Sequence, residues 1–488
     1  MTSTTNFTER TEQFWNWFTA NEEKLSQFAQ NRDQGDSGQA AIEFISEGVS
    51  LLSENLHFNI GGDHEFTFAV NANDALFFLL PYVTANLPEP FRDKWTFHPC
   101  MQGTGGQNFG FAMYETQVDT DRVMVSATPA EGGQTADLLF YAKEWESLEE
   151  NNCYNAFYIL MELSIGEALA NACIEEVKKA DSPTDDMFPL TQLEQWLLDT
   201  LCENGEAPDP ANRYFAYSGK PDTENPQLRQ DVFAGSTNYM TIINGYYGGK
   251  DNCYQTFAGF GAKPLFLYYY YDGEADRKTI LNERYDLTDK LEAEVLGERG
   301  TGQEIGLMLG GAMGEYCAYI DLLLYDEQAF MEKARELLAD SPYMIFCKEF
   351  YPDGQEFLLT DLSVPGFKKR LQQLHEVGAH REIIKIFEAL PVEQKDFDLT
   401  NLYARALNNV DEEEKALQVL DSIREPGELD ALWNWRYGYA LYYLEREAES
   451  IPYLQKAIEL GDESEETAQL LQMALEQQEN EEDNEIAS

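Results

Sequence analysis

The histidines are the first residues to consider for metal binding and proton transfer, and the chain has only five. His57 and His64 have acidic neighbours, and these residue types together could bind a metal ion. His375 and His380 are five residues apart, a spacing that does not put both on one face of a helix, and the chain has no His-Glu-x-x-His motif. Ordinary polar residues of a hairpin explain His57 and His64 better, so we predict no metal-binding residues.

Two glycine-rich segments have the composition of phosphate-binding loops but not their spacing. In residues 103–110, Asn108 replaces the third glycine of Gly-x-Gly-x-x-Gly, and no strand–helix–strand unit surrounds the segment. In residues 244–251, Asn244 and Asp251 stand where a phosphate loop requires a glycine and a Ser or Thr. The Gly-x-Ser-x-Gly motif of many hydrolases is absent. We interpret both segments as turns and predict no catalytic residue, no cofactor-binding residue and no cofactor.

Carboxylate pairs do not identify an active site in this chain, because 88 Asp and Glu residues produce many close pairs by chance. Against 34 Lys and Arg residues they give a net charge of −54. Such a charge repels nucleic-acid phosphates and anionic membrane surfaces, which both bind proteins through basic patches. We therefore expect no nucleic-acid or membrane partner, and a protein partner that is basic if charge guides the encounter.

The seven cysteines are scattered over the chain without a Cys-x-x-Cys pair, which argues against a zinc knuckle or a thioredoxin-type site. Most stand in apolar stretches, where a free thiol behaves as a small hydrophobic group. The N-terminus lacks a basic segment followed by an apolar run, and no apolar stretch is long enough to cross a bilayer. We expect a cytoplasmic protein. Four consecutive tyrosines, residues 268–271, could face a ligand, although alternation on a strand would bury two of them.

The elements that would position these residues change in character along the chain. Residues 7–30 predict an amphipathic helix with an aromatic face that includes Phe14, Trp15 and Phe18, and residues 57–70 predict a hairpin. Short strands then alternate with helices, which is typical of an α+β fold. We expect an α+β domain over residues 1–203, a proline-rich linker over 204–225 and a second α+β domain over 226–362. The similar segments 137–141 and 321–325, 184 residues apart, suggest that the second domain duplicates the first.

The opening segment, residues 14–25, resembles the start of an uncharacterised bacterial α+β domain family, over about 150 residues. That family implies no activity.

The pattern becomes entirely helical from about residue 364, with a 34-residue period. At this offset Ala404 corresponds to Gly438 and Leu407 to Leu441. A helical hairpin requires small residues, such as Ala404 and Gly438, where its two helices approach each other closely. Further pairs at this offset are Ala416 with Ser450, Leu417 with Ile451, and Leu420 with Leu454. Segments 435–441 and 450–460 closely resemble a tetratricopeptide (TPR) repeat, although Gly461 and Asp462 replace the proline that follows the second helix in that family.

The resemblance implies about three TPR-like hairpins over residues 366–476, near the minimum for a stable array, followed by an acidic tail over 477–488. It implies a superhelix whose concave groove binds a peptide or helix, while so short an array could instead pack on the chain's own domains. We expect the partner to contact an exposed face of the first helices, formed by Asn401, Arg405, Asn408, Arg436, Tyr439 and Tyr443.

These features favour a non-enzymatic protein of the bacterial cytoplasm that recruits a protein partner through a short TPR-like array. An alternative is an acidic antagonist of the immunity type that binds a basic toxin or nuclease, which the charge suggests. A further alternative is an enzyme of unrecognised class in the α+β region. Adaptation to high salt would also explain the acidic composition.

Overall fold

The computed structural model describes residues 5–30, 36–202, 205–222, 227–271, 276–339, 341, 343–360, 371, 374–376, 378–389 and 395–487. The chain forms two compact units. The first contains Met1–Tyr268, Leu281–Leu337 and Cys347–Phe357, and the second contains Tyr269–Ile280, Leu338–Phe346 and Leu358–Ser488. Helices and strands alternate in the first unit, and the chain ends in a helical stretch, so the predicted mixture of α and β structure followed by helices is confirmed.

The first unit begins with two helices and a three-stranded sheet. Helices α1 (Phe7–Gln30) and α2 (Asp36–Val49) precede strands β1 (His57–Ile60) and β2 (Glu65–Ala69), which pair as an antiparallel hairpin. Helix α3 (Leu80–Ala85) leads to β3 (Thr96–His98), which pairs with β2 in parallel. The predicted aromatic face of α1 is buried, and the ring centroids of Phe18 and Trp95 are 5.3 Å apart. The first predicted helix and the hairpin are therefore confirmed.

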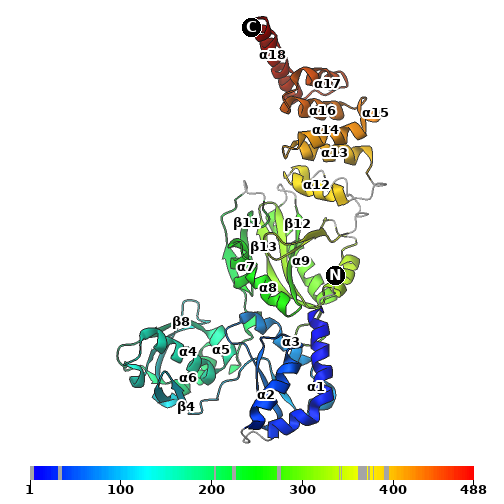
Figure 1. Cartoon of the computed structure of the whole chain (residues 1–488). Helices are drawn as coiled ribbons and strands as arrows, with labels where there is room; N and C mark the ends of the chain where they lie inside the picture. The colour runs from blue at the N-terminus through cyan, green and yellow to red at the C-terminus, as the bar shows by residue number, and fades with distance from the viewer. Residues whose placement is uncertain are drawn as a thin grey trace. The chain divides into compact units, whose positions relative to one another are not determined.

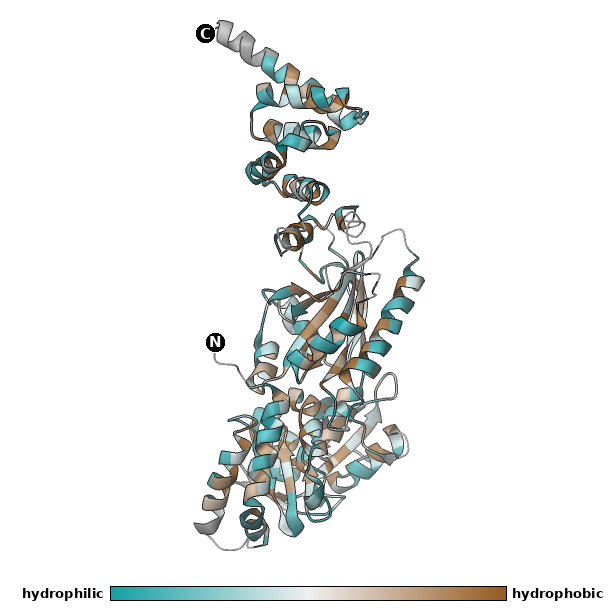
Figure 2. Cartoon of the chain, turned by 90° about the vertical axis from the view of Figure 1, so that its right-hand side faces the viewer, coloured by the Kyte–Doolittle hydropathy of each residue, from teal (hydrophilic) through white to brown (hydrophobic). Residues whose placement is uncertain are grey.

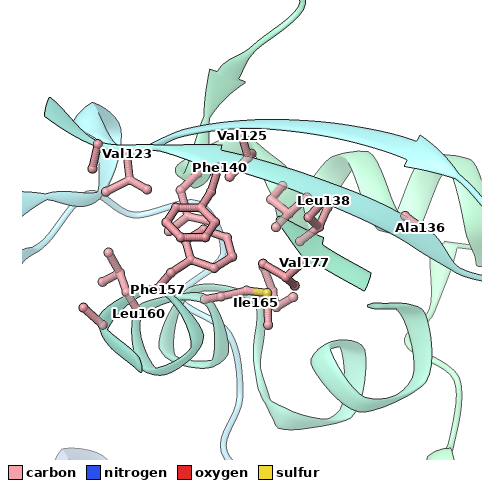
Figure 3. Packing of buried hydrophobic residues seen from close by; sticks show 14 of the residues in the cluster. Val123, Val125, Ala136, Leu138, Phe140, Phe157, Leu160, Ile165 and Val177 are labelled. Carbon is pink, nitrogen blue, oxygen red and sulfur yellow. The ribbon is translucent and has the colours of Figure 1, made fainter. Parts of the chain in front are cut away.

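A four-stranded sheet and three helices follow. The sheet has the order β8-β7-β6-β9, and the helices pack on one of its faces (Figure 3). The Phe140 ring on β7 stacks on the Phe157 ring on α4, with centroids 4.1 Å apart, at the centre of this core. The elements are the two-stranded β4 (Gly110–Met113) and β5 (Thr116–Asp119), then β6 (Met124–Pro129), β7 (Ala136–Tyr141), α4 (Glu150–Ile165), α5 (Glu167–Cys173), β8 (Ile174–Lys179), β9 (Phe188–Pro189) and α6 (Leu193–Leu201).

The largest sheet has seven strands in the order β10-β11-β13-β14-β12-β15-β16. Strands β13 and β14 are buried at every position, as expected for central strands that are covered on both faces. Figure 2 shows brown stretches in the strands of the large sheet, with helices of mixed hydropathy around them. The elements are β10 (Phe215–Ser218), β11 (Val232–Thr237), α7 (Met240–Tyr247), α8 (Asn252–Gly259), β12 (Lys263–Tyr270), α9 (Arg277–Lys290), the π-helical η9 (Leu291–Leu296), β13 (Gly306–Gly314), β14 (Cys317–Leu324), α10 (Glu327–Leu337), β15 (Phe346–Glu349) and β16 (Glu356–Leu358).

The glycines of β13 allow the backbones of this sheet to pack closely. Gly310 has a φ of 140° at a β-bulge, and a Cβ atom there would lie 2.1 Å from the carbonyl oxygen of Ser236. At Gly311 a Cβ atom would lie 2.4 Å from Nη1 of Arg284, which extends from α9. A side chain at either position would therefore force strands or helix apart.

The second unit consists mainly of helices that pack on one another in chain order, as Figure 1 shows for α12 to α17. Ala404, Leu420, Trp433, Tyr437 and Leu441 share one core cluster between these helices. At Gly438 a Cβ atom would lie 2.8 Å from Leu454, so a small residue permits the close approach of α16 and α17. The helices are α12 (His380–Ala389), α13 (Phe397–Asn408), α14 (Glu413–Ser422), α15 (Arg424–Gly427), α16 (Ala431–Tyr443), α17 (Glu447–Glu459) and α18 (Glu465–Ala487).

Three expectations about the organisation differ from the structure. The segment expected as a linker contains β10, whose backbone pairs with β11 although its composition is typical of a loop. Segments 137–141 and 321–325 lie in sheets of four and seven strands with different strand orders, so the two regions do not share one topology. The expected acidic tail continues helix α18 as far as Ala487.

Candidate functional site

An aromatic ladder runs along one face of α16. Trp435, Tyr439 and Tyr443 follow one another at intervals of four residues, so their side chains lie above one another on the helix. The ring centroids are 4.9 Å apart for Trp435 and Tyr439 and 4.4 Å apart for Tyr439 and Tyr443. Tyr443 is 54% exposed, and Leu432, one turn before Trp435, is 55% exposed. Trp435 and Tyr439 are partly exposed. A row of stacked rings that solvent can reach is characteristic of a surface that binds another molecule.

The neighbouring helix α13 presents Arg405, which is exposed. Asn401 and Asn408, expected on the same exposed face, are instead buried, and so is Arg436 on α16. Asn408 Nδ2 donates to the carbonyl oxygen of Arg436 at 3.1 Å, and Arg436 Nη1 donates to the carbonyl oxygen of Asn401 at 3.0 Å. The expectation that all six residues are exposed is therefore wrong for these three, because the close packing of α13 on α16 covers them. Of the other three, Arg405 and Tyr443 are exposed and Tyr439 is partly exposed.

The buried side-chain amides of Asn401 and Asn408 do not make all the hydrogen bonds that they could make within the described residues. Oδ1 of Asn401 and Oδ1 of Asn408 are buried and accept no hydrogen bond from the residues that the structure describes. Asn401 Nδ2 donates to Oδ1 of Asp430, the residue that also caps α16 by accepting from the Trp433 N–H. The name α13–α16 face is used below for seven residues of these two helices: Asn401, Arg405, Asn408, Trp435, Arg436, Tyr439 and Tyr443.

The α13–α16 face is positively charged within a strongly acidic chain. Burial and the nearby Arg405 lower the pKa of Arg436 to about 10, against the effect of Asp430. Burial also lowers the pKa of Arg405, while Glu466 and Glu376 raise it. No salt bridge of Arg405 or Arg436 occurs among the described residues, so an incoming carboxylate would find the exposed guanidinium of Arg405 without a bound acid, while that of Arg436 is buried.

The two histidines that the sequence separates are brought together beside this face. Nδ1 of His375 lies 3.1 Å from Nδ1 of His380, because Gly378, with a φ of 74°, turns the chain between them. Burial lowers the pKa of His375 to about 3, with further contributions from Arg405, His380 and Arg436. Burial and Arg405 also lower the pKa of His380. At neutral pH both rings are uncharged, and one must donate to the other.

The glycine-rich segment 103–110 lines a pocket of about 540 Å³ in the first unit. Gly105 and Gly106 have φ values of 62° and 78°, and the backbone there holds the carboxylate of Glu194 at the start of α6. Oε2 of Glu194 is buried and accepts no hydrogen bond from the described residues. Burial raises the pKa of Glu194, and Trp196 adds an aromatic wall. The prediction of a turn is confirmed, and Gly105 and Gly106 line a pocket that the spacing of the glycines did not indicate.

A second pocket of about 360 Å³, also in the first unit, is lined by amide and hydroxyl side chains at half of its residues. His57 contributes to it, together with Asn55, Asn71 and Gln255. Within the described ranges no group of three His, Cys, Asp or Glu side chains could hold a metal ion, and none of the described helices is long and apolar enough to span a membrane.

The four consecutive tyrosines do not form an exposed ligand surface. Tyr268, Tyr269 and Tyr271 are at most 3% exposed, and only Tyr270 is partly exposed. The expectation that alternation buries two of the four is therefore wrong, because β12 is covered on both faces.

Three features were not predicted from the sequence: Trp435 as a member of the ladder, the histidine pair, and the buried Oε2 of Glu194, which has no hydrogen-bond partner among the described residues. The four-residue spacing of Trp435, Tyr439 and Tyr443 was a signal that could have identified the ladder. Comparisons with family models, with curated proteins and with solved structures each found no match to this chain.

Proposed function

We propose that this chain is a non-enzymatic interaction protein whose C-terminal helices form a tetratricopeptide-type array and bind a segment of a partner protein. The observation that carries the proposal is the ladder of Trp435, Tyr439 and Tyr443, whose first two rings are partly exposed and whose third is exposed, together with the exposed Arg405 on the neighbouring α13. The 34-residue offset supports the repeat interpretation, since Ala404 in α13 and Gly438 in α16 are both small residues at buried positions.

The chemistry of the α13–α16 face defines the segment that it would bind. Stacked rings favour an aromatic or aliphatic side chain, which loses its hydration shell against them. The exposed guanidinium of Arg405 favours a carboxylate close to that side chain. The partner segment is therefore an acidic peptide with a nonpolar residue, in contrast to the basic partner that net charge alone suggested.

The test compares the full-length chain with Arg405→Glu/Tyr439→Ala in binding to an array of acidic and basic peptides that each contain aromatic residues. The matched control is Lys456→Glu/Ile458→Ala on α17, where both side chains are also exposed. We expect the first variant to lose at least tenfold in affinity for the acidic peptides, while the control binds like the parent chain. Equal binding by all three proteins would refute the site.

The acidic-antagonist alternative makes the opposite prediction for the same variant. A basic partner attracted by the net charge of −54 would bind the chain more tightly after Arg405→Glu, because the substitution adds negative charge. Its affinity would also fall steeply with salt, whereas stacking on the ladder would persist.

A further inference from the structure

Two thiols of the first unit lie next to each other although 29 residues separate them in the chain. Sγ of Cys173 is 3.9 Å from Sγ of Cys202. Cys173 is the last residue of α5, and Cys202 directly follows α6. We propose that this pair is an oxidation site, which a small-molecule disulfide converts into an intramolecular disulfide bond. The proposal concerns the first unit and does not depend on partner binding by the second.

The exposure of the two sulfurs fixes the order of the reaction. Cys173 is 1% exposed, and Cys202 is partly exposed. A reagent in solvent therefore reaches Cys202, and only the sulfur of Cys202 reaches Cys173. None of the other described cysteines has both a neighbouring thiol and a side chain that solvent reaches. Cys317 and Cys347, for example, are at most 2% exposed.

The chemistry balances in two exchange steps. The Cys202 thiolate attacks one sulfur of the small disulfide, an S–S bond to Cys202 forms, and the other half leaves as a thiolate. The Cys173 thiolate then attacks Sγ of Cys202 and expels the second half. The protein loses two electrons and two protons, and the small disulfide is reduced to two thiols that take up both protons.

The surroundings make the second step the slower one. Burial and the neighbouring Cys202 raise the pKa of Cys173 to about 12, and Arg213 opposes this shift. Burial also raises the pKa of Cys202, whose hydrogen bond with Cys173 acts in the opposite direction. Because the thiolate is the attacking species, the closing step should accelerate about tenfold per pH unit below the pKa of Cys173.

The product would fix the C-terminal end of α6 to the junction of α5 and β8. Helix α6 carries Glu194, Trp196 and Asp199, which line the pocket of about 540 Å³. Oxidation would thus restrain the helix that forms one wall of this pocket, and we expect a higher thermal unfolding temperature for the oxidised first unit.

The experiment exposes the full-length chain at pH 8 to oxidised glutathione, blocks free thiols with N-ethylmaleimide, and identifies disulfide-linked peptides by mass spectrometry without reduction. We expect one cross-link, between Cys173 and Cys202. In Cys173→Ser the glutathione adduct should accumulate on Cys202, whereas in Cys202→Ser the thiol of Cys173 should stay free, like that of Cys347.

Circular dichroism checks that each variant is folded. If Cys173→Ser does not fold, Cys202→Ser still decides, because that side chain is only partly buried. A folded parent chain without the cross-link, a cross-link from Cys202 to another cysteine, or glutathione on Cys173 in Cys202→Ser would each overturn the proposal.

Discussion

Arg229 and Asp321 form a fully buried ion pair in the large sheet, with Nη1 of Arg229 2.6 Å from Oδ1 of Asp321. Arg229 adopts a φ of 67°, its N–H donates to the Tyr319 hydroxyl at 2.9 Å, and its guanidinium lies 5.2 Å from the centre of the Phe266 ring. Neighbouring charges raise the pKa of Arg229 above its usual value, mainly that of Asp321, although burial acts in the opposite direction. The Arg229 guanidinium therefore stays charged inside an aromatic cage.

Removing one partner of this ion pair should destabilise the first unit. We expect Asp321→Asn to lower the free energy of unfolding by about 3–5 kcal/mol, because the Arg229 charge stays buried without compensation. Urea unfolding followed by tryptophan fluorescence measures the loss. The double variant Arg229→Met/Asp321→Leu should recover most of the stability. If the double variant were as unstable as Asp321→Asn, packing rather than charge would be responsible.

The two glycines of α2 should respond to alanine in opposite directions. A Cβ atom at Gly48 would lie 2.2 Å from the Trp17 ring, whereas at Gly38 nothing lies within 4 Å. Gly48→Ala should therefore destabilise the chain by about 1–3 kcal/mol through overpacking. Gly38→Ala should stabilise it by about 0.5–1 kcal/mol, because alanine favours the helix. Thermal unfolding of both variants checks the pair, and a shared sign would contradict the packing of α2 on α1.

Glu22 on α1 should contribute acid-sensitive stability. Burial alone would raise its pKa, but hydrogen bonds from Lys94, Ser26 and Trp95 outweigh burial and lower the pKa to about 2. The folded carboxylate is thus favoured above its ordinary pKa of about 4.5, and the gain disappears as the pH falls towards 2. We expect Glu22→Gln to cost about 1–3 kcal/mol at pH 7 and nothing near pH 2.

The control for Glu22 is Glu12→Gln, on the exposed side of the same helix. Both variants remove one negative charge from an acidic chain, so only their difference reports the local contacts. A difference that does not change with pH would contradict the assignment.

His375 should remain uncharged far below the usual pKa of histidine. Its pKa of about 3 in the folded chain lies below the ordinary value of 6.5. As the pH falls, the His375 ring is therefore protonated in the unfolded state before it is protonated in the folded state. The second unit should therefore lose stability progressively below pH 6.5. An NMR titration of the imidazole signals should show no midpoint for His375 between pH 5 and 7. A midpoint near 6.5 would show that the ring is solvated and the pair with His380 is not formed.

Local patterns predicted the elements that depend on neighbouring residues. The aromatic period of α1 and the alternation in β1 and β2 were sufficient to predict the first helix and the hairpin. Strand β13 was not predicted, because its glycines are typical of a loop. It forms a strand because its backbone pairs with β11 on one side and with β14 on the other.

The candidate site, too, was predicted only where it depends on residues close together in the sequence. The spacing of Tyr439 and Tyr443 already placed them on one helix face. The burial of Asn401 and Arg436 depends on a contact between helices 35 residues apart in the chain, and the proximity of Cys173 and Cys202 depends on a contact 29 residues apart. No local pattern contains either contact.

The strand order of the large sheet has a consequence for its behaviour at high concentration. The outermost strands, β10 and β16, are four and three residues long. Short outer strands expose few unpaired N–H and C=O groups, which are the groups that let sheets of separate molecules join into fibres. Combined with mutual repulsion at a net charge of −54, this arrangement should keep a concentrated solution clear and free of large particles in light scattering.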